Sequence, residues 1–557
     1  MRITDTSDLW WKTAVIYCLD VETYLDWNGD GTGDFEGLSH RIDYLAELGV
    51  TCLWLMPFYP TPNRDDGYDI SDYYGVDPRL GHLGDFVEVV RTARDRGIRV
   101  IVDLVVNHTS DQHPWFRASR SSIDSPYRDW YVWRDEPPEH PEATAFPGEE
   151  TGTWQYDAKT RQYYLHNFYH FQPDLNVTNP LVRDEVAKVM GFWLQLGVTG
   201  FRVDAVPFFL DTEGVEPGHG QLKNPLAFLK SLRAFLERRS GEAILLGEVN
   251  LSRPKQLTYF GGDDADGLTM QFDFIGMENL YLSLARQDAR PLASALAKRP
   301  VLPPAAQWAN FVRNHDELTL DKLTTAQRDE VFAAFGPEPE MQMYGRGIIR
   351  RLAPMLEGDP RRIRMVYSLL FSMPGTPVLF YGQEIGMGED LSRGDREAVR
   401  TPMQWTHDAN GGFSSAPAPK LAAPVVSGGY SPEHVNVARQ RHDRDSLLHL
   451  IRRLIERYRA SAEIGWGDFT LLDQPDHAIL AHSMSGDEGR MLAVHNFSAE
   501  PALVSLTLDG IDEPTKLIDL LQDGHATTDD HGRVELSLDA YGYRWLRQVS
   551  PGEKRLF

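Results

Sequence analysis

In the stretch Gly197-Val-Thr-Gly-Phe-Arg-Val-Asp204 a predicted helix ends at a glycine and a predicted strand begins. The segment before it carries apolar residues at helical spacing, which share one face of a predicted helix: Val186, Val189, Met190 and Trp193. Gly197 can adopt the left-handed conformation that ends a helix. The apolar run after it predicts a strand that is buried on both faces, as parallel strands are.

The same helix–glycine–strand unit recurs along the chain. Helical spacing over 38–48 precedes Gly49 and a strand at 51–55, and helical spacing over 86–93 precedes Gly97 and a strand at 99–103. Further strands are predicted over 14–19, 243–248, 268–274, 308–313 and 376–381. With 200–204 these make eight, which favours an α/β fold of the closed (β/α)₈ TIM-barrel type. An open doubly wound sheet is the alternative that periodicity leaves in place.

Two long stretches interrupt the alternation. Residues 109–175 are rich in Trp, Tyr, His and Pro and predict an inserted subdomain after the third strand, and residues 317–370 predict an insertion after the seventh. We therefore expect the catalytic barrel over 1–108 and 176–462. Period-2 alternation farther on predicts a C-terminal antiparallel β-sandwich over 463–557.

The composition excludes several classes of protein. A net charge of −25 and a pI near 5.1 disfavour nucleic acid and anionic membranes as partners. The N-terminus has neither a basic nor an apolar segment typical of a signal peptide, and no apolar run approaches 20 residues, so we expect a cytoplasmic protein. Cys18 and Cys52 lie in apolar runs and are interpreted as core residues. The oligomeric state is not predicted.

Polar and charged residues follow four of the predicted strands: Asp103 with Asn107-His108, Arg202 with Asp204, Glu248, and Asn314-His315-Asp316. An acidic residue at a strand end often only caps the next helix. Four such ends inside apolar runs instead favour one shared site, because barrel strands end at a common mouth. Glycoside cleavage needs such a set: one carboxylate attacks the anomeric carbon, and a second protonates the leaving oxygen.

These four blocks resemble, in order, the signature regions of the α-amylase family. Gln172-Pro-Asp-Leu-Asn176 and Gly375-Thr-Pro-Val-Leu-Phe-Tyr-Gly382 resemble two further family blocks. The resemblance covers about residues 10–550 and implies a retaining mechanism. It implies Asp204 as nucleophile, Glu248 as general acid/base and Asp316 as transition-state stabiliser. His108, Arg202 and His315 would complete the first sugar subsite.

Asp65-Asp66-Gly67-Tyr68-Asp69 and Arg400-Thr-Pro-Met-Gln-Trp405 resemble the exo-acting glucosidase and isomerase branch. The resemblance implies an ion pair between Asp65 and Arg400 that closes the pocket behind the non-reducing glucose. Tyr68 would stack on that glucose. A closed pocket favours small α-glucosides such as maltose or trehalose as substrates.

The stretch Asp26-Trp-Asn-Gly-Asp-Gly-Thr-Gly-Asp34 places oxygen ligands at alternate positions around glycines, as calcium loops do. It predicts a Ca²⁺ site formed by Asp26, Asn28, Asp30, Thr32 and Asp34; an acidic surface turn is the alternative. The family resemblance implies a second Ca²⁺ site, with ligands Asn107, Asp174, Phe208, Phe209 and Asp211.

Within the family, Gly347-Ile-Ile-Arg-Arg-Leu-Ala-Pro354, Gly394-Asp-Arg396 and the insertion at 317–370 resemble the subgroup that interconverts maltose and trehalose. The chain departs from that subgroup at four places, which we expect to border the acceptor sugar: Phe171, Val249-Asn-Leu-Ser252, Gly220-Gln-Leu-Lys-Asn-Pro225 and Tyr17-Cys-Leu-Asp-Val-Glu22. The expected function is an α-glucoside isomerase. An exo-α-glucosidase, a transglucosidase with another acceptor, and a non-catalytic carbohydrate-binding homologue are the alternatives.

Overall fold

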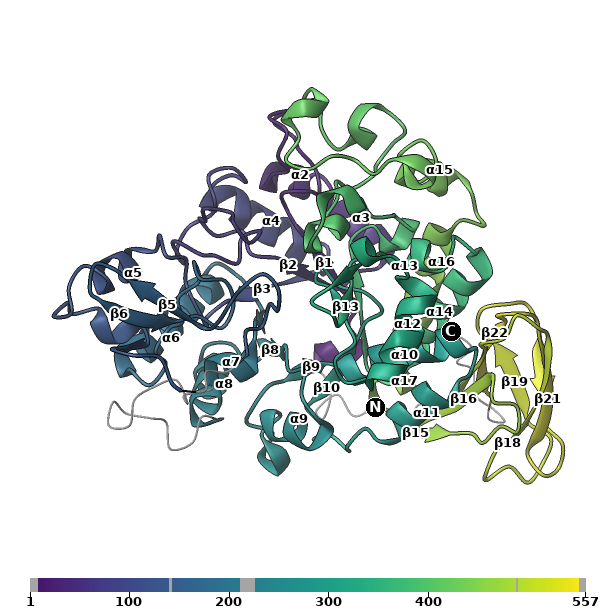
Figure 1. Ribbon diagram of the computed structural model, residues 1–557. Coiled ribbons are helices and arrows are strands. Elements are labelled where there is room, and N and C mark those ends of the chain that lie inside the picture. The colour runs from purple at the N-terminus through teal and green to yellow at the C-terminus, as the bar shows by residue number, and fades with distance from the viewer. Residues whose placement is uncertain (1–8, 140–142, 211–225, 487–488, 550–557) are drawn as a thin grey trace.

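The computed structural model describes residues 9–139, 143–210, 226–486 and 489–549. Its centre is a closed barrel of eight parallel strands (Figure 1). Their order is β1 (Ile16–Leu19), β14 (Thr376–Phe380), β10 (Gln307–Asn310), β9 (Met270–Phe272), β8 (Ile244–Gly247), β7 (Gly200–Val203), β3 (Arg99–Leu104) and β2 (Cys52–Leu55). All eight lie within or next to the predicted ranges. The TIM barrel is therefore confirmed, and the open sheet is wrong.

The helices around the barrel follow the predicted signals with one exception. α4 (Leu83–Asp95) and α6 (Pro180–Gln195) lie where helical spacing places them, and α16 (Leu447–Arg459) is another long helix beside the barrel. The spacing over 38–48 instead covers two short helices, α2 (Phe35–Ser39) and α3 (Ile42–Leu48). The chain bends between them, where the Arg41 guanidinium lies 4.2 Å from the Trp405 ring.

The other α-helices cover the barrel or its ends: α7 (Val206–Leu210), α8 (Leu226–Arg239), α9 (Arg253–Tyr259), α10 (Phe274–Arg286), α11 (Arg290–Ala297), α13 (Leu352–Met355), α14 (Pro360–Ser372), α15 (Val437–His442) and α17 (Ala462–Trp466). Both cysteines are free and buried in the core. Among the helices formed by the described residues, none is long and apolar enough to cross a bilayer.

A close approach of two strands brings the predicted catalytic residues together. Gly200 has φ +155°, and a Cβ atom there would lie 2.6 Å from the carbonyl oxygen of Ile244. Only glycine therefore allows β7 to pack this tightly against β8. Asp204 and Glu248 directly follow these two neighbouring strands.

Each insertion forms a small sheet of its own. Residues 109–175 hold α5 (Pro114–Ser119) and a sheet of β4 (Trp133–Arg134), β6 (Gln162–Leu165) and β5 (Trp154–Asp157), which lies to the left in Figure 1. Residues 317–370 hold a sheet of β11 (Leu318–Thr319), β13 (Gly347–Ile348) and β12 (Gln342–Met343), together with α12 (Thr325–Phe335).

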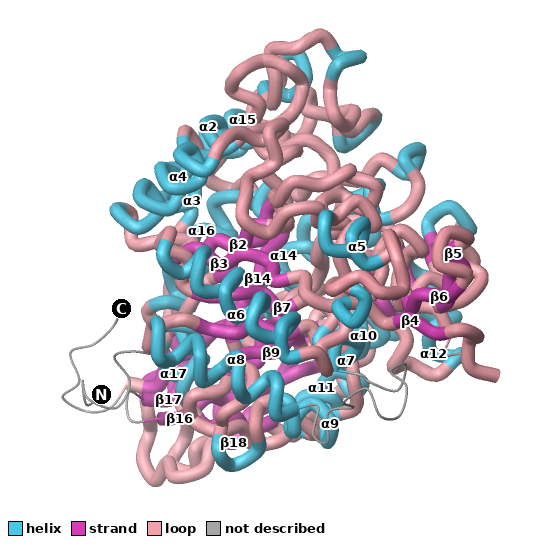
Figure 2. Tube along the Cα trace, turned by 90° about the vertical axis from the view of Figure 1, so that its left-hand side faces the viewer, coloured by secondary structure: helices cyan, strands magenta, loops and turns pink. Residues whose placement is uncertain are grey.

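The C-terminal part consists of antiparallel sheets that lie beside the barrel (Figure 2). Six strands form one sheet: β15 (Asp468–Leu471), β16 (Ile479–Gly486), β17 (Gly489–Asn496), β22 (Tyr543–Gln548), β19 (Lys516–Asp519) and β20 (His525–Thr527). β18 (Ala502–Thr507) and β21 (Arg533–Leu538) form the other. Buried and exposed residues alternate along β21, as the period-2 pattern predicts.

Candidate active site

A cavity of about 520 Å³ lies beyond the C-terminal ends of the barrel strands. Asp204, Glu248 and Asp316 line it together, although they come from separate parts of the chain. Tyr68 and His108 are also in its wall. Each of the four predicted strand ends thus contributes at least one side chain to a single cavity.

The guanidinium of Arg202 binds both carboxylates that are predicted to be catalytic, those of Asp204 and Glu248. Its Nη1 donates to Asp103 Oδ1 at 2.6 Å and to the carboxylate of Asp204. Its Nη2 donates to Glu248 Oε2 at 2.7 Å. The guanidinium is buried, so these ion pairs are little screened by solvent. A retaining mechanism needs two carboxyl groups about 5–5.5 Å apart. Binding to one guanidinium keeps Asp204 and Glu248 near each other, as this mechanism requires.

The surroundings give Asp204 and Glu248 different affinities for a proton. Burial raises the pKa of Asp204 to about 6, although Arg202 opposes the rise. Burial raises the pKa of Glu248 to about 7; Arg202 again opposes the rise, and Asp204 adds to it. Near neutral pH Asp204 is therefore mostly ionised, as a nucleophile must be. Glu248 keeps a substantial protonated fraction, as a general acid must.

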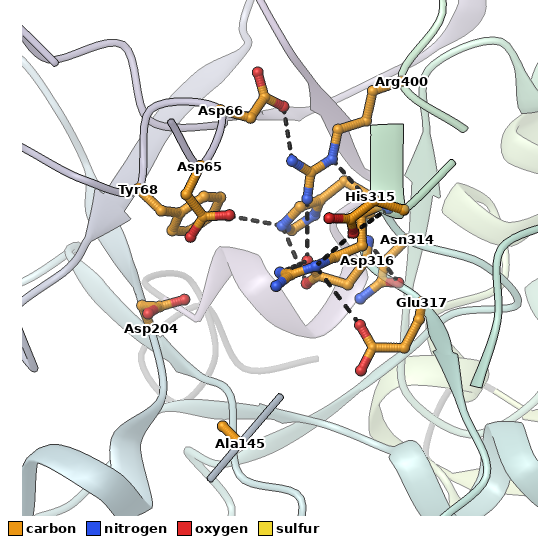
Figure 3. A network of polar contacts seen from close by, with 12 residues as sticks. Asp65, Asp66, Tyr68, Ala145, Asp204, Asn314, His315, Asp316, Glu317 and Arg400 are labelled. Carbon is orange, nitrogen blue, oxygen red and sulfur yellow. Dashed lines mark hydrogen bonds and ion pairs between the residues drawn. The ribbon is translucent and has the colours of Figure 1, made fainter. Parts of the chain in front are cut away.

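Asp316 lines the cavity next to two arginines, Arg396 and Arg400 (Figure 3). Its Oδ1 accepts hydrogen bonds from Arg396 Nη1 at 2.9 Å and Arg400 Nη2 at 3.2 Å, and His315 Nε2 lies 3.2 Å from Oδ2. Burial disfavours the charged carboxylate, but the guanidinium groups of Arg396 and Arg400 outweigh it and hold the pKa of Asp316 well below its usual range. Asp316 is therefore a permanent negative charge, suited to stabilising an oxocarbenium-like transition state.

Tyr68 and the two histidines form a neutral hydrogen-bonding wall. Tyr68 Oη lies 2.7 Å from His315 Nε2, and their rings are nearly parallel. His108 Nε2 lies 3.2 Å from the carbonyl oxygen of Tyr68. Burial lowers the pKa of His108 to about 4 and holds the pKa of His315 well below its usual value. Both rings are neutral at pH 7, and neutral donors suit sugar hydroxyl groups.

The residue after the predicted nucleophile has a strained backbone that no sequence pattern indicated. Ala205 has φ +45°, a conformation that costs a residue with a Cβ atom about 1–3 kcal/mol. Its N–H donates to Glu248 Oε2 at 3.2 Å. The strain thus directs a backbone donor at the predicted acid/base.

The implied ion pair between Asp65 and Arg400 is wrong, because Arg400 pairs with Asp66 instead of Asp65. Arg400 Nη1 donates to Asp66 Oδ2 at 2.8 Å (Figure 3). Asp65 instead lines the cavity, and its Oδ2 accepts a hydrogen bond from Gln172 Nε2 at 2.7 Å. Both acids lie in one tight turn, and residue type alone does not say which of them faces Arg400.

Side chains from both insertions complete the wall of the cavity. Phe146 and Phe168 come from residues 109–175, and Thr319 and Arg346 from residues 317–370. Arg346 was not predicted as a site residue, since it follows no barrel strand. Arg396 also lines the cavity; its only signal was the block Gly394-Asp-Arg396, four residues before Arg400.

The four departures from the subgroup do not all border the cavity. Asn250 and Leu251 do so. Asp20 and Glu22 instead line a second, small polar cavity with Arg400. The Phe171 ring is covered by the Arg64 guanidinium at 4.2 Å and does not line the cavity. Residues 220–225 lie outside the described part of the chain.

The predicted calcium ligands of the first loop make hydrogen bonds to backbone N–H groups. Asp26 accepts from Gly29 and Gly31, and Asp34 from Gly37. In the second set, Asn107 Nδ2 donates to Asp174 Oδ1 at 3.1 Å, whereas Asp211 is outside the described residues. Within the described residues, no three His, Cys, Asp or Glu side chains are grouped to hold a metal ion. Both calcium sites stay predictions.

Two domain models match the chain. The α-amylase catalytic domain covers residues 21–333 and 349–467, and the C-terminal domain of sucrose hydrolase-like proteins covers 489–547. The trehalulose synthase MutB of Pseudomonas mesoacidophila, solved as an inactive double mutant with isomaltulose, superposes with a TM-score of 0.77 at 27% identity. That match covers 97% of this chain and 99% of the other.

Curated relatives are more similar in sequence. The trehalose synthase of Pimelobacter is 40% identical, over 97% of this chain and 96% of its own length. The trehalose synthase of Thermus thermophilus is 45% identical over 90% of this chain, which spans about half of that longer relative (52%). The oligo-1,6-glucosidase of Bacillus cereus is 30% identical over 90% of this chain. The chain therefore belongs to the α-amylase family, in the part of it that includes the enzymes named trehalose synthase.

Proposed function

We propose that the protein interconverts maltose and trehalose through a covalent glucosyl-enzyme intermediate. The observation that carries this proposal is the convergence of Asp204, Glu248 and Asp316 on one cavity, with Arg202 between the first two. The relatives named trehalose synthase supply the substrate pair.

The reaction divides into two displacements at one anomeric carbon. Asp204 attacks that carbon while Glu248 gives its proton to the glycosidic oxygen, so that glucose leaves and a glucosyl ester forms. The freed glucose then turns within the cavity. Its anomeric hydroxyl attacks the anomeric carbon of the glucosyl ester, Glu248 takes up the proton of that hydroxyl, and the bond to Asp204 breaks, which releases the carboxylate. Two inversions retain the α configuration.

Isomerisation requires that the freed glucose stays and that water stays out. The two insertions meet over the cavity in a way that supports this. Arg346 Nη2 donates to the carbonyl oxygen of Ala145 at 2.6 Å. The rings of Phe146 and Tyr344 stack with centroids 5.0 Å apart.

One assay tests the proposal. The protein is incubated with maltose, and in parallel with trehalose, and the products are resolved by NMR. Each disaccharide is expected to yield the other, with a smaller amount of glucose. Glucose alone from maltose would reject isomerisation and leave an exo-α-glucosidase. Turnover of neither sugar would leave a different α-glucoside as the substrate.

We further propose that the loop Asp26–Asp34 binds Ca²⁺. The alternate spacing of its oxygen-bearing residues supports this, and the ion would brace the loop in front of α2. The second site at Asn107 and Asp174 is proposed on the family resemblance. No step of the reaction depends on either ion.

A further inference from the structure

Two neighbouring acids, Asp65 and Asp66, point to different sides of the active site (Figure 3). Asp65 lines the sugar cavity. Asp66 lines a separate cavity of about 80 Å³, which it shares with Arg400, Asp20 and Glu22. The two carboxylates therefore have different surroundings, although one peptide bond joins the residues.

The backbone accounts for this separation. Asp66 has φ +46°, in the left-handed region, and Gly67 follows it at φ +89°. The turn is closed by the N–H of Tyr68, which donates to the carbonyl oxygen of Asp65 at 2.9 Å. A non-glycine residue keeps such a conformation only where its surroundings fix it, and strain of this kind clusters at functional sites.

Arg400 is fixed at three points. Nη1 bonds Asp66 Oδ2 at 2.8 Å, Nε donates to the carbonyl oxygen of His315 at 2.9 Å, and Nη2 bonds Asp316 Oδ1 at 3.2 Å. The guanidinium is only 3% exposed and the Asp66 carboxylate 14%, so their ion pair is largely shielded from water. Of these partners, Asp66 supplies the charge on the side away from the sugar.

We propose that Asp66 is a positioning residue, whose carboxylate holds Arg400 against Asp316 and thereby orients the stabilising carboxylate. Asp65, which does not pair with Arg400, then binds hydroxyl groups of the bound glucose. This division of roles rests on the α-glucosidic chemistry proposed above. It does not depend on whether the glucosyl group passes to glucose or to water.

The test compares Asp66→Asn with Asp65→Asn, two isosteric changes at adjacent residues. Cleavage of 4-nitrophenyl α-glucoside gives kcat, and calorimetry gives the Kd for glucose. A catalytic group that is misplaced by about 1 Å can lower the rate about 100-fold. We expect Asp66→Asn to lower kcat roughly 10- to 100-fold and to leave the Kd for glucose nearly unchanged. Asp65→Asn is expected to raise that Kd.

The control is Asp157→Asn, which removes a buried carboxylate from an ion pair with Arg120 in the insertion, 2.6 Å long. It should leave both quantities unchanged. Wild-type kcat in Asp66→Asn would overturn the proposal. A rise in Kd as large as that of Asp65→Asn would also do so, because Asp66 would then bind the sugar.

Folding is checked by the melting temperature of each variant. If Asp66→Asn does not fold, Asp66→Glu keeps the charge but moves it by one methylene, and the same fall in kcat at constant Kd is expected. Wild-type kcat in that variant would contradict positioning by Asp66. The aryl glucoside reports only glucosyl release, so a protein that makes no trehalose from maltose still gives a clear result.

Discussion

The proton affinities of Asp204 and Glu248 make the rate depend on pH in both directions. Below about pH 6 Asp204 becomes protonated and no longer attacks; above about pH 7 Glu248 loses the proton that the leaving oxygen needs. We expect a bell-shaped profile of kcat/KM with a maximum between these values. Because the two carboxyl groups interact, the two apparent pKa values of this profile describe the pair and not the individual residues. Steady-state kinetics from about pH 4.5 to 9 measures it; a flat profile would contradict these roles.

Replacing the acid/base separates the two roles further. Glu248→Gln should lower kcat/KM for maltose by about 10²–10⁴-fold, the usual contribution of a general acid. α-Glucosyl fluoride has a leaving group that needs no proton, so its first displacement should lose much less. Asp204→Asn should lose turnover of both substrates, and this would also exclude a non-catalytic homologue. Equal losses for both substrates in Glu248→Gln would reject its role as acid.

Among the structural elements, strand ends could be predicted from the sequence and turns could not. A buried parallel strand is an apolar run after a glycine, so Asp204 and Glu248 stand out by their position in the chain. The partner of Arg400 depends on the backbone of one turn, where φ of Asp66 is +46°. Two adjacent aspartates carry no signal for that. Arg346 was missed for a related reason, since the tertiary fold decides which residues of its insertion reach the cavity.

The contact between the two insertions should control how much sugar is lost to water. Arg346→Ala removes the hydrogen bond to Ala145, and Phe146→Ala removes the stacking on Tyr344. Both variants are expected to raise the ratio of glucose to trehalose formed from maltose several-fold, because an open cavity admits water. NMR of the products measures this ratio. Arg120→Ala, in the same insertion but paired with Asp157, serves as the control. An unchanged ratio in both variants would show that this contact does not exclude water.

Calcium should stabilise the folded protein if the loop Asp26–Asp34 binds it. A ligand that binds only the native state stabilises it by about 2.7 kcal/mol at 100 times its Kd. We expect the melting temperature to rise with Ca²⁺ and to fall with a chelator, and calorimetry to detect binding. Asp30→Ala should abolish both effects, whereas Asp124→Ala, at another exposed turn, should not. Absence of a thermal shift and of binding heat would leave this loop as an acidic turn.

The junction between barrel and C-terminal sheet should make stability depend on pH. His482 and His495, on β16 and β17, are fully buried with nearly parallel rings. Their Nε2 atoms lie 2.9 Å from the Ser372 carbonyl oxygen and from Ser368 Oγ, both on α14. Burial lowers the pKa of His482 to about 4 and holds the pKa of His495 well below its usual value.

Both histidines therefore bind protons more readily in the unfolded chain, where the usual pKa is about 6.5. Their contribution is fully present above about pH 6.5 and is lost as the pH falls toward 4, at up to about 3 kcal/mol for His482. Urea unfolding followed by Trp fluorescence should show this loss of stability between about pH 6.5 and 4. In His482→Gln the slope should be smaller than in the native chain, because one buried ring no longer takes up a proton on unfolding. An identical slope in the two proteins would mean that other groups set the acid sensitivity, since the junction would then contribute nothing to it.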